Sequence, residues 1–419
     1  MTNEKIISTP TSPSPSPSAP TASLPEPPSI GKELDHFIDQ MDSLATALPL
    51  VVQVTEKVLK DAIDNLLAFL APHKAARESD AHYTIPRDKL STLLELMKTL
   101  VRSVPSGPLI RASFIVSTVS QFDAFLGRLL RCLFYLQPGL LNASERHLSF
   151  GQLLDLGSVE AAREYIIEKE IESTLRSSHA DQFSSLETRF SVPLRKDLPI
   201  WSAFIEVTER RNLFVHCDGI VSSQYIKVCK EHNVALPDDV KLGKKLAVTS
   251  EYFASAYHCI VEIAVKLAHV LWRKTAPQQI AAADDSLIGI TYELLCREHY
   301  HLAAALLDFA IAVLKKHSSE DARRIFIVNR AIVHKHCGKE EECRRLLAKE
   351  DWTACSDKFQ LAVAVLQDET SRAVKIMKDI GKRDEVGEHG YRDWPLFKRF
   401  RDSEQFLMAY EQIGLAPVP

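Results

Sequence analysis

The stretch LIRASFIVSTVSQFDAFLGRLLRCLFYL, residues 109–136, decides the fold class of this chain. Its apolar side chains recur every three or four residues, which is the repeat of one face of an α-helix. They are Phe114, Val119, Phe122, Phe125, Leu126, Leu129, Leu130 and Leu133. Because Gly107-Pro108 precedes the stretch and Pro138-Gly139 follows it, we predict one long helix over 109–136.

Helical spacing continues on both sides, and strand-like alternation is hard to find. Upstream, the pattern predicts helices within 33–70, interrupted at Pro49, and another over 87–101. Downstream, 149–190 is helical but less regular. A helix then begins near Asp197-Leu198-Pro199 and ends at Gly219, a short one covers 223–232, and a long one capped by Ser250 runs to Lys274. The predicted fold class is therefore all-α.

Composition divides the chain into four regions. Residues 1–31 are rich in Pro, Ser and Thr, so we predict a disordered tail. An N-terminal helical segment covers 32–106 and a helical bundle covers 107–275. A polar, alanine-rich linker over 276–284 leads into a helical-hairpin domain over 283–419, whose short helices and small alanine positions resemble degenerate tetratricopeptide repeats.

Charge and cysteine usage narrow the functional class. The net charge of −4 over 419 residues is not that of a protein that coats nucleic acid, so any nucleic-acid contact must be local. The eight cysteines include no CxxC pair, which favours a reducing, cytoplasmic location. There is no apolar N-terminal stretch of signal length and no window of about 18 uncharged apolar residues. We therefore expect a soluble protein that does not contact a membrane.

One short run offers distinctive chemistry. Residues 209–219 read ERRNLFVHCDG and contain an Arg-Asn-x-x-x-His core on a predicted helix. Arg211 can hold a phosphate with two parallel hydrogen bonds, and His216 can donate or accept a proton near neutral pH. An arginine and a histidine can together cut RNA without a metal ion.

The spacing alone leaves the role of this pair open. Arg77 and His82 match the same interval by chance, and Arg330/His336 and Arg383/His389 match one residue longer. Arg211 and His216 lie about 140° apart around a helix. Arg211 must therefore reach round, the helix must loosen near Gly219, or a partner subunit must complete the site. The plain alternative is a solvated arginine and a hydrogen-bonded histidine at a helix end.

The wider run resembles a known superfamily. Residues 209–221, followed by Tyr225, resemble the HEPN signature, an Arg-x(4–6)-His helix that often has Asn directly after the Arg. The segment SQFDAFL, residues 120–126, resembles the HEPN helix that faces this motif. The likeness covers about 107–275 and is greatest to prokaryotic defence-associated members. It implies a homodimeric bundle, an RNA substrate and metal-independent endoribonuclease activity in antiphage defence or stress.

The resemblance also implies roles for individual residues. Arg211 would stabilise the charge of the pentavalent phosphate, and His216 would serve as general acid or base for attack by the RNA 2′-hydroxyl. Asn212 would orient the histidine or a phosphate oxygen. Asp123 is a weaker candidate for the polar residue on the facing helix, and a helix-dipole or surface role suits it at least as well. Glu209 is a supporting candidate because its carboxylate favours a cationic histidine nearby.

Other signals are weaker. The loop that contains Lys241, Lys244 and Lys245 is a candidate guide for the RNA backbone or simply a solvated loop. No four-ligand metal set and no phosphate-binding glycine loop is present in the sequence, so we expect no metal and no cofactor. Two rivals remain: a non-catalytic RNA- or nucleotide-binding module, and a toxin-type subunit controlled by a partner protein. A protein or small-molecule regulator would act through the C-terminal helices.

Overall fold

The computed structural model describes residues 28–74, 82–143, 147–383 and 386–415. Within this part the chain is helical throughout, with two isolated β-bridges and no strand. The all-α prediction is confirmed. The predicted disordered tail lies outside the described residues up to residue 27, and the first helix already begins at Ile30 with a buried side chain.

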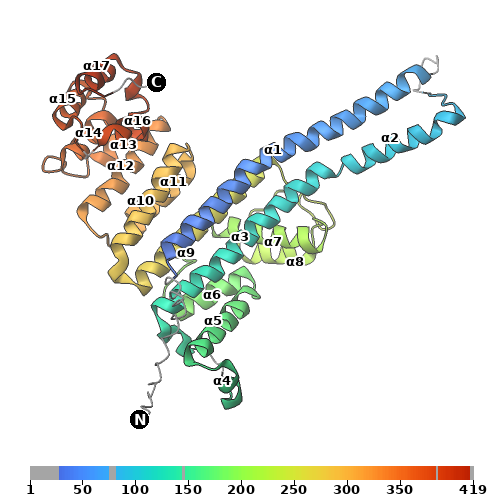
Figure 1. Cartoon of the computed structure of the whole chain (residues 1–419), viewed down its shortest axis with the longest axis horizontal. Helices are drawn as coiled ribbons and strands as arrows, with labels where there is room; N and C mark the ends of the chain where they lie inside the picture. The colour runs from blue at the N-terminus through green and yellow to red at the C-terminus, as the bar shows by residue number, and fades with distance from the viewer. Residues whose placement is uncertain (1–27, 75–81, 144–146, 384–385, 416–419) are drawn as a thin grey trace, which may run out of the picture.

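A long two-helix arm projects from the body (Figure 1). It is formed by the distal half of α1 (Ile30–Leu70) and by α2 (Leu90–Ser103), which follows the 3-10 turn Arg87–Lys89. The predicted interruption at Pro49 is wrong, because α1 runs through it. The Pro49 ring is exposed, so the carbonyl that loses its hydrogen bond lies on a side that water reaches.

The proximal half of α1 joins the helical bundle. The centre of that bundle is α3 (Ser106–Leu136), the helix predicted from residues 109–136, together with α9 (Ser250–Thr275). Phe37 of α1 lies 4.7 Å from Phe125 of α3, ring to ring. Thr249, one residue before the predicted cap, accepts the hydrogen bond that starts α9. The remaining elements of the bundle are the 3-10 segment Pro138–Ala143, α4 (Phe150–Leu156), α5 (Val159–Leu175), α6 (His179–Phe190), α7 (Trp201–His216) and α8 (Ser223–Glu231).

Beyond the bundle the chain forms successive helical hairpins. α12 packs on α11 and α13, and α14 packs on α15, as expected for a hairpin array. A π-helical segment, Phe309–Val313, extends α11. The helices are α10 (Ile280–Cys296), α11 (Tyr300–Asp308), α12 (Glu320–His336), α13 (Glu340–Leu347), α14 (Asp357–Leu366), α15 (Thr370–Ile380), α16 (Gly387–Asp393) and α17 (Glu404–Gln412), with 3-10 turns at Pro395–Phe397 and Phe400–Asp402.

The predicted linker over 276–284 is wrong. A 3-10 turn, Pro277–Gln279, leads directly into α10, so the bundle and the hairpins are joined without a flexible segment. Asp284 is fully buried at this junction, where it accepts hydrogen bonds from Arg273 of α9 at 2.8 Å and from the Ser318 amide at 2.6 Å. One continuous hydrophobic core extends from Ile30 to Leu415 through both units.

Two helical stretches are long and apolar enough to cross a membrane by length and composition: Arg87–Leu136 and Ser250–Thr275. Two thirds of the apolar window of the second, α9, is buried inside the protein, as in the core helix of a globular bundle. Only a third of the window in the first is buried. Its N-terminal part belongs to the arm.

Candidate functional site

Three helices bring a polar cluster together at one face of the bundle. α3 supplies Asp123, the first residue of α6 supplies His179, and α7 supplies Arg211. Ring contacts hold these helices against each other, with Phe204 of α7 at 5.1 Å from Phe122 of α3 and 5.6 Å from Phe183 of α6. The hydrophobic spacing that predicted the long helix thus also fixes the position of Asp123, which follows the buried Phe122.

The Asp123 carboxylate bridges a histidine and an arginine. Arg211 donates from Nη2 to Asp123 Oδ2 at 2.9 Å, and His179 Nε2 lies 2.9 Å from Asp123 Oδ1. Asp123 is 27% exposed, Arg211 20% and His179 7%. The Arg211 Nε is buried without a hydrogen-bond partner among the described residues, so the guanidinium still has donor capacity.

Glu209 and Asn212 lie one turn apart on α7 beside this cluster. Asn212 donates from Nδ2 to Glu209 Oε1 at 3.3 Å, and not to the histidine, which was one of its two expected partners beside a phosphate oxygen. Burial raises the pKa of the Glu209 carboxyl, and the charges of His179, Arg211 and a second histidine, His232, oppose that rise. His232 also accepts at Nδ1 from the Trp201 indole at 3.4 Å.

His216 does not join this cluster within one chain. It is the last residue of α7, its side chain is exposed, and no hydrogen bond or ion pair links it to Arg211 in the described structure. The helix does not loosen enough to unite them: Cys217 and Gly219 donate to the Leu213 carbonyl at 2.8 and 3.0 Å, which closes the last turn. Neither a reoriented Arg211 nor a loosened helix end therefore joins the two side chains in the described structure.

The predicted lysine loop lies beside the C-terminal end of α7. Val221 donates to the Lys244 carbonyl at 2.9 Å, which ties the loop to the residues after Gly219. Acidic neighbours already neutralise two of the lysines: Lys244 pairs with Asp239 at 2.5 Å and Lys245 with Asp218 at 2.7 Å. Lys241 is exposed. The loop thus lies near the end of α7 that carries His216, and not beside the Asp123 cluster.

The neighbouring Arg210 has a structural role. Its guanidinium is buried, donates to Glu206 at 2.7 Å and stacks 3.9 Å from the centre of the Tyr252 ring. Tyr225 and Tyr252 donate their hydroxyls to the two oxygens of Glu206 at 2.7 and 2.8 Å. Because every oxygen of Glu206 is satisfied internally, this network fixes α7 against α8 and α9 and leaves Arg211 as the arginine that faces the cluster.

Sequence reasoning missed His179 and His232. The region 149–190 showed irregular helical spacing, and nothing in it marked a functional histidine. The available signal was Ser178, a helix-capping residue directly before His179, which accepts from the Asp181 amide and places the histidine at the first position of α6. Among the described residues, no group of three or more His, Cys, Asp and Glu side chains is placed to hold a metal ion.

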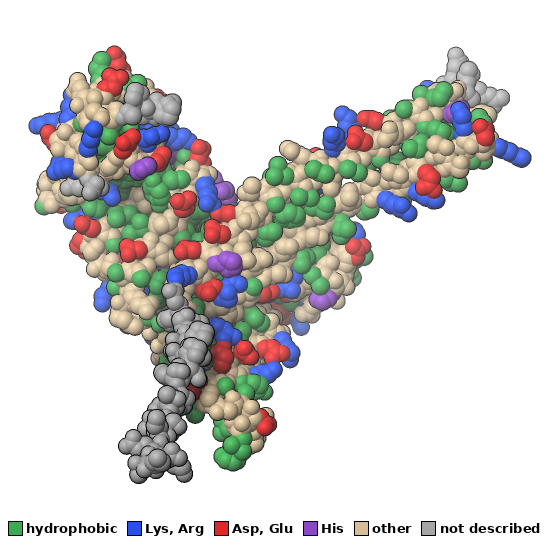
Figure 2. Space-filling view, viewed as in Figure 1, with side chains coloured by type: hydrophobic (Ala, Val, Ile, Leu, Met, Phe, Trp, Pro, Cys, Tyr) green, Lys and Arg blue, Asp and Glu red, His purple; other side chains and the backbone are tan. Residues whose placement is uncertain are grey.

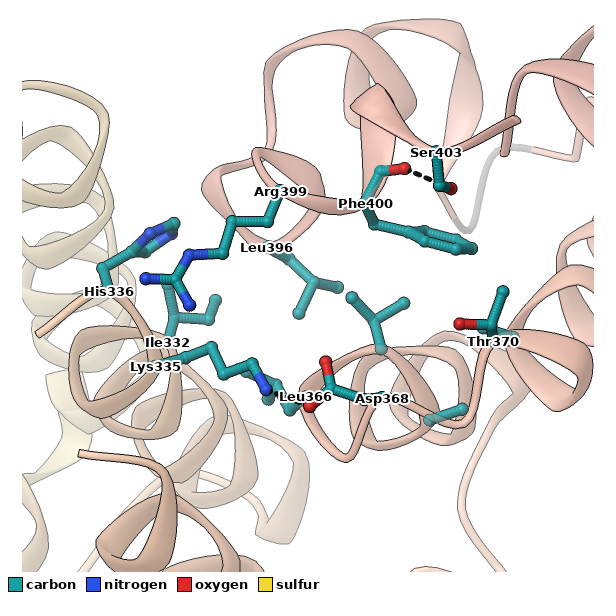
Figure 3. Close-up of a pocket in the computed structure, with 13 residues that line it drawn as sticks. Ile332, Lys335, His336, Leu366, Asp368, Thr370, Leu396, Arg399, Phe400 and Ser403 are labelled. Carbon is teal, nitrogen blue, oxygen red and sulfur yellow. Dashed lines mark hydrogen bonds and ion pairs between the residues drawn. The ribbon is translucent and has the colours of Figure 1, made fainter. Parts of the chain in front are cut away.

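The C-terminal helices contain a separate small cavity of about 180 Å3 (Figure 3). Lys335, His336 and Arg399 line one side of it, opposite Thr370 and Ser403. Its charges are largely balanced, because Lys335 pairs with Asp368 and Arg399 lies 3.8 Å from Glu340. Burial lowers the pKa of His336, and its Nε2 lies 3.0 Å from the Pro395 carbonyl oxygen.

Comparison with known proteins gives no relative for this chain: no family model, no curated protein and no solved structure matches it.

Proposed function

We propose that this protein is a metal-independent endoribonuclease of the HEPN type. The observation that carries the proposal is the Arg211 guanidinium, which is partly exposed and is held beside a histidine by the bridging Asp123. Such a fork can bind two oxygens of a phosphate, and its charge favours a pentavalent transition state over the substrate. Support also comes from the resemblance of residues 209–221 to the HEPN signature.

The reaction requires a base and an acid as well as the arginine. A base removes the proton of the RNA 2′-hydroxyl, and the 2′-oxygen attacks the adjacent phosphorus. The bond from phosphorus to the 5′-oxygen breaks, and an acid protonates that oxygen. The products are a 2′,3′-cyclic phosphate and a 5′-hydroxyl. We assign one of these proton transfers to His216 of a second copy, because in its own chain His216 is exposed at the helix end and away from Arg211.

The test is cleavage of labelled RNA in EDTA by the purified full chain. We expect products with cyclic-phosphate ends and a loss of about 100-fold or more in Arg211→Ala and His216→Ala. Arg211→Lys should recover only part of the rate, since a lysine ammonium is a point charge without the fork. Arg345→Ala and His389→Ala, at exposed positions of the C-terminal helices, are the matched controls.

Two results would reject the proposal. One is undiminished cleavage by Arg211→Ala, which would point to a contaminating nuclease. The other is RNA binding without cleavage under all conditions, including mixtures with a cell extract. The second result would support the rival, a non-catalytic RNA- or nucleotide-binding module. That rival is favoured by one observation: Asp123 already neutralises Arg211 in the single chain.

Regulation and biological setting are part of the same proposal. The resemblance suggests a role in antiphage defence or a stress response. If the role is antiphage defence, expression of the wild-type chain should reduce phage plating, and expression of Arg211→Ala should not. A regulator that is a small molecule would find both charges and hydroxyls in the cavity between Lys335 and Ser403. Substituting Arg399 by Ala should then alter control of cleavage without altering RNA binding at the bundle.

A further inference from the structure

A second cavity lies among the C-terminal helices, with a volume of about 210 Å3 and no lining residue in common with the cavity of Figure 3. Its walls come from α10, α12, the first turn of α14 and the chain around α16. Its buried floor includes Val328, Asn329 and Phe359. Tyr292, Lys358 and Trp394 are half-buried and form its rim.

Asn329 is the polar side chain of this floor and is 3% exposed. Its carboxamide has no hydrogen-bond partner among the described residues. By contrast, the buried Thr291 hydroxyl donates to the Leu287 carbonyl at 2.8 Å, and the buried Asp284 is paired as described above. A buried amide without a partner costs free energy, so such groups are rare in folded proteins. The Asn329 side chain therefore offers an NH2 donor and a carbonyl acceptor to a molecule in the cavity.

Water is a poor occupant for this floor. A buried water typically needs about three polar partners. The walls beside Asn329 are hydrocarbon and aromatic, from Ile325, Val328, Phe359 and Trp394. A ligand with flat apolar faces and one edge that both donates and accepts hydrogen bonds matches these walls and the amide together.

We propose that this cavity binds the base of a purine mononucleotide. Each purine has an edge with a donor beside an acceptor, and a carboxamide pairs with such an edge through two hydrogen bonds. The flat ring stacks on aromatic side chains, here Phe359 and Trp394, and stacking is favourable for every base. The volume of about 210 Å3 is below the roughly 300–1,000 Å3 of pockets for drug-sized ligands. It therefore suits the base, and the sugar and phosphate extend past the rim.

The rim supplies a cation for the phosphate. Lys358 Nζ lies 5.6 Å from the centre of the Trp394 ring, and Lys358 forms no ion pair with a described residue. Its acidic neighbour, Asp357, is itself paired with Arg383 at 3.3 Å. Lys358 also belongs to the first turn of α14, a helix of 10 residues whose N-terminal end carries partial positive charge. An anionic group beside the base is therefore favoured there.

A free nucleotide fits this site better than a strand of nucleic acid or a peptide. Figure 2 shows basic and acidic side chains intermingled over the visible face of the C-terminal helices, so that face has no broad positive surface for a polyanion. An extended peptide repeats its hydrogen-bonding groups along a groove, whereas this floor offers the amide of Asn329. The inference concerns the C-terminal helices and does not rest on RNA cleavage.

The test is isothermal titration calorimetry of the full chain with AMP, GMP and UMP. We expect one AMP or GMP to bind per chain, and UMP to bind more weakly because its single ring stacks less. Asn329→Leu keeps the size of the side chain and removes its hydrogen bonds, so purine binding should weaken about 5- to 150-fold. Its melting temperature should not fall, because an apolar side chain suits an apolar floor. Asn65→Leu, the same change at an exposed position of α1, is the matched control.

A second variant tests the rim without disturbing the floor. Lys358→Ala should weaken AMP binding several-fold and leave adenosine binding unchanged, whereas Lys375→Ala, at an exposed position of α15, should change neither. Arg211→Ala should also bind AMP normally, which separates this site from the bundle.

Four results would overturn the inference. They are no saturation by AMP or GMP at millimolar concentration, equal binding of UMP, purine binding that Asn329→Leu leaves intact, and purine binding that Arg211→Ala abolishes. In the Arg211→Ala background, tighter binding of a short oligodeoxyadenylate than of AMP would also overturn it, by assigning the site to a nucleic-acid strand. Cleavage of labelled RNA is measured separately, so this inference and the proposed function fail independently.

Discussion

Replacing Asp123 by Ala removes the one carboxylate that holds both Arg211 and His179. A charge-assisted hydrogen bond contributes about 1.5–3 kcal/mol. The bond to Arg211 is partly solvent-screened and is worth less than this. The His179 side is nearly buried, so loss of its partner there carries close to the full cost. We therefore expect the opening of the start of α6 to become easier by about 2–3 kcal/mol in total.

Hydrogen exchange followed by mass spectrometry measures this opening directly. Amides in the first turns of α6 should exchange about 30- to 150-fold faster in Asp123→Ala, since 1.4 kcal/mol corresponds to a factor of ten. Asp123→Asn keeps the shape and one acceptor, so its effect should be intermediate. Ser120→Ala, an exposed change on the same helix, is the control. Exchange in α6 that changes less than twofold in Asp123→Ala would show that the bridge does not position His179.

Three further predictions concern stability. Phe204→Ala should lower the free energy of unfolding by about 3–5 kcal/mol and the melting temperature with it, because a buried ring against Phe122 and Phe183 leaves a cavity. Burial alone would raise the pKa of Asp284, but hydrogen bonds from His317, Ser318 and Arg273 outweigh it and hold the pKa well below its ordinary value. The stability from Asp284 is therefore present above the ordinary carboxyl pKa and is lost only in strong acid; Asp284→Asn should cost about 3 kcal/mol or more at neutral pH, checked by denaturant unfolding. The contribution of Glu209 to stability has the opposite pH dependence. Because its pKa is raised, this contribution is most favourable in acid and falls as pH rises through the folded pKa. Glu209→Gln should therefore stabilise the protein at neutral pH and lose that advantage near pH 4. A stabilisation by Glu209→Gln that is the same at both pH values would contradict the assigned cause.

Local signals in the sequence predicted the helices well. Residues 109–136 form one helix, and the chain turns at Gly219 and Gly338, which both have the positive φ that glycine tolerates. Helix ends depend on residues close in sequence, so they can be predicted from it. The predictions at Pro49 and over 276–284 were wrong for a common reason. The exposure of Pro49 and the burial of Asp284 depend on helices distant in sequence, and local composition does not contain that information.

The candidate site could be predicted only in part. Arg211 lies on the predicted helix and meets Asp123 of the facing helix, 88 residues earlier. His179 meets the same carboxylate from 56 residues away, and no spacing rule connects the two. His216 shares a helix with Arg211, yet the helical repeat turns them apart. The motif therefore pointed to Arg211, which does lie in the polar cluster. The position of His179 beside it depends on how three helices pack, which no motif describes.

The buried junction around Asp284 has a consequence for how this protein can be divided. Cutting the chain after α9 would divide the shared hydrophobic core and expose the apolar faces of α9 and α10. It would also leave Arg273 without its counter-ion, Asp284. Neither fragment would then keep the packing that it has in the intact chain. Work on the bundle should keep the last third of the polypeptide attached, and a swap of that third between homologues would have to carry the α9–α10 seam with it.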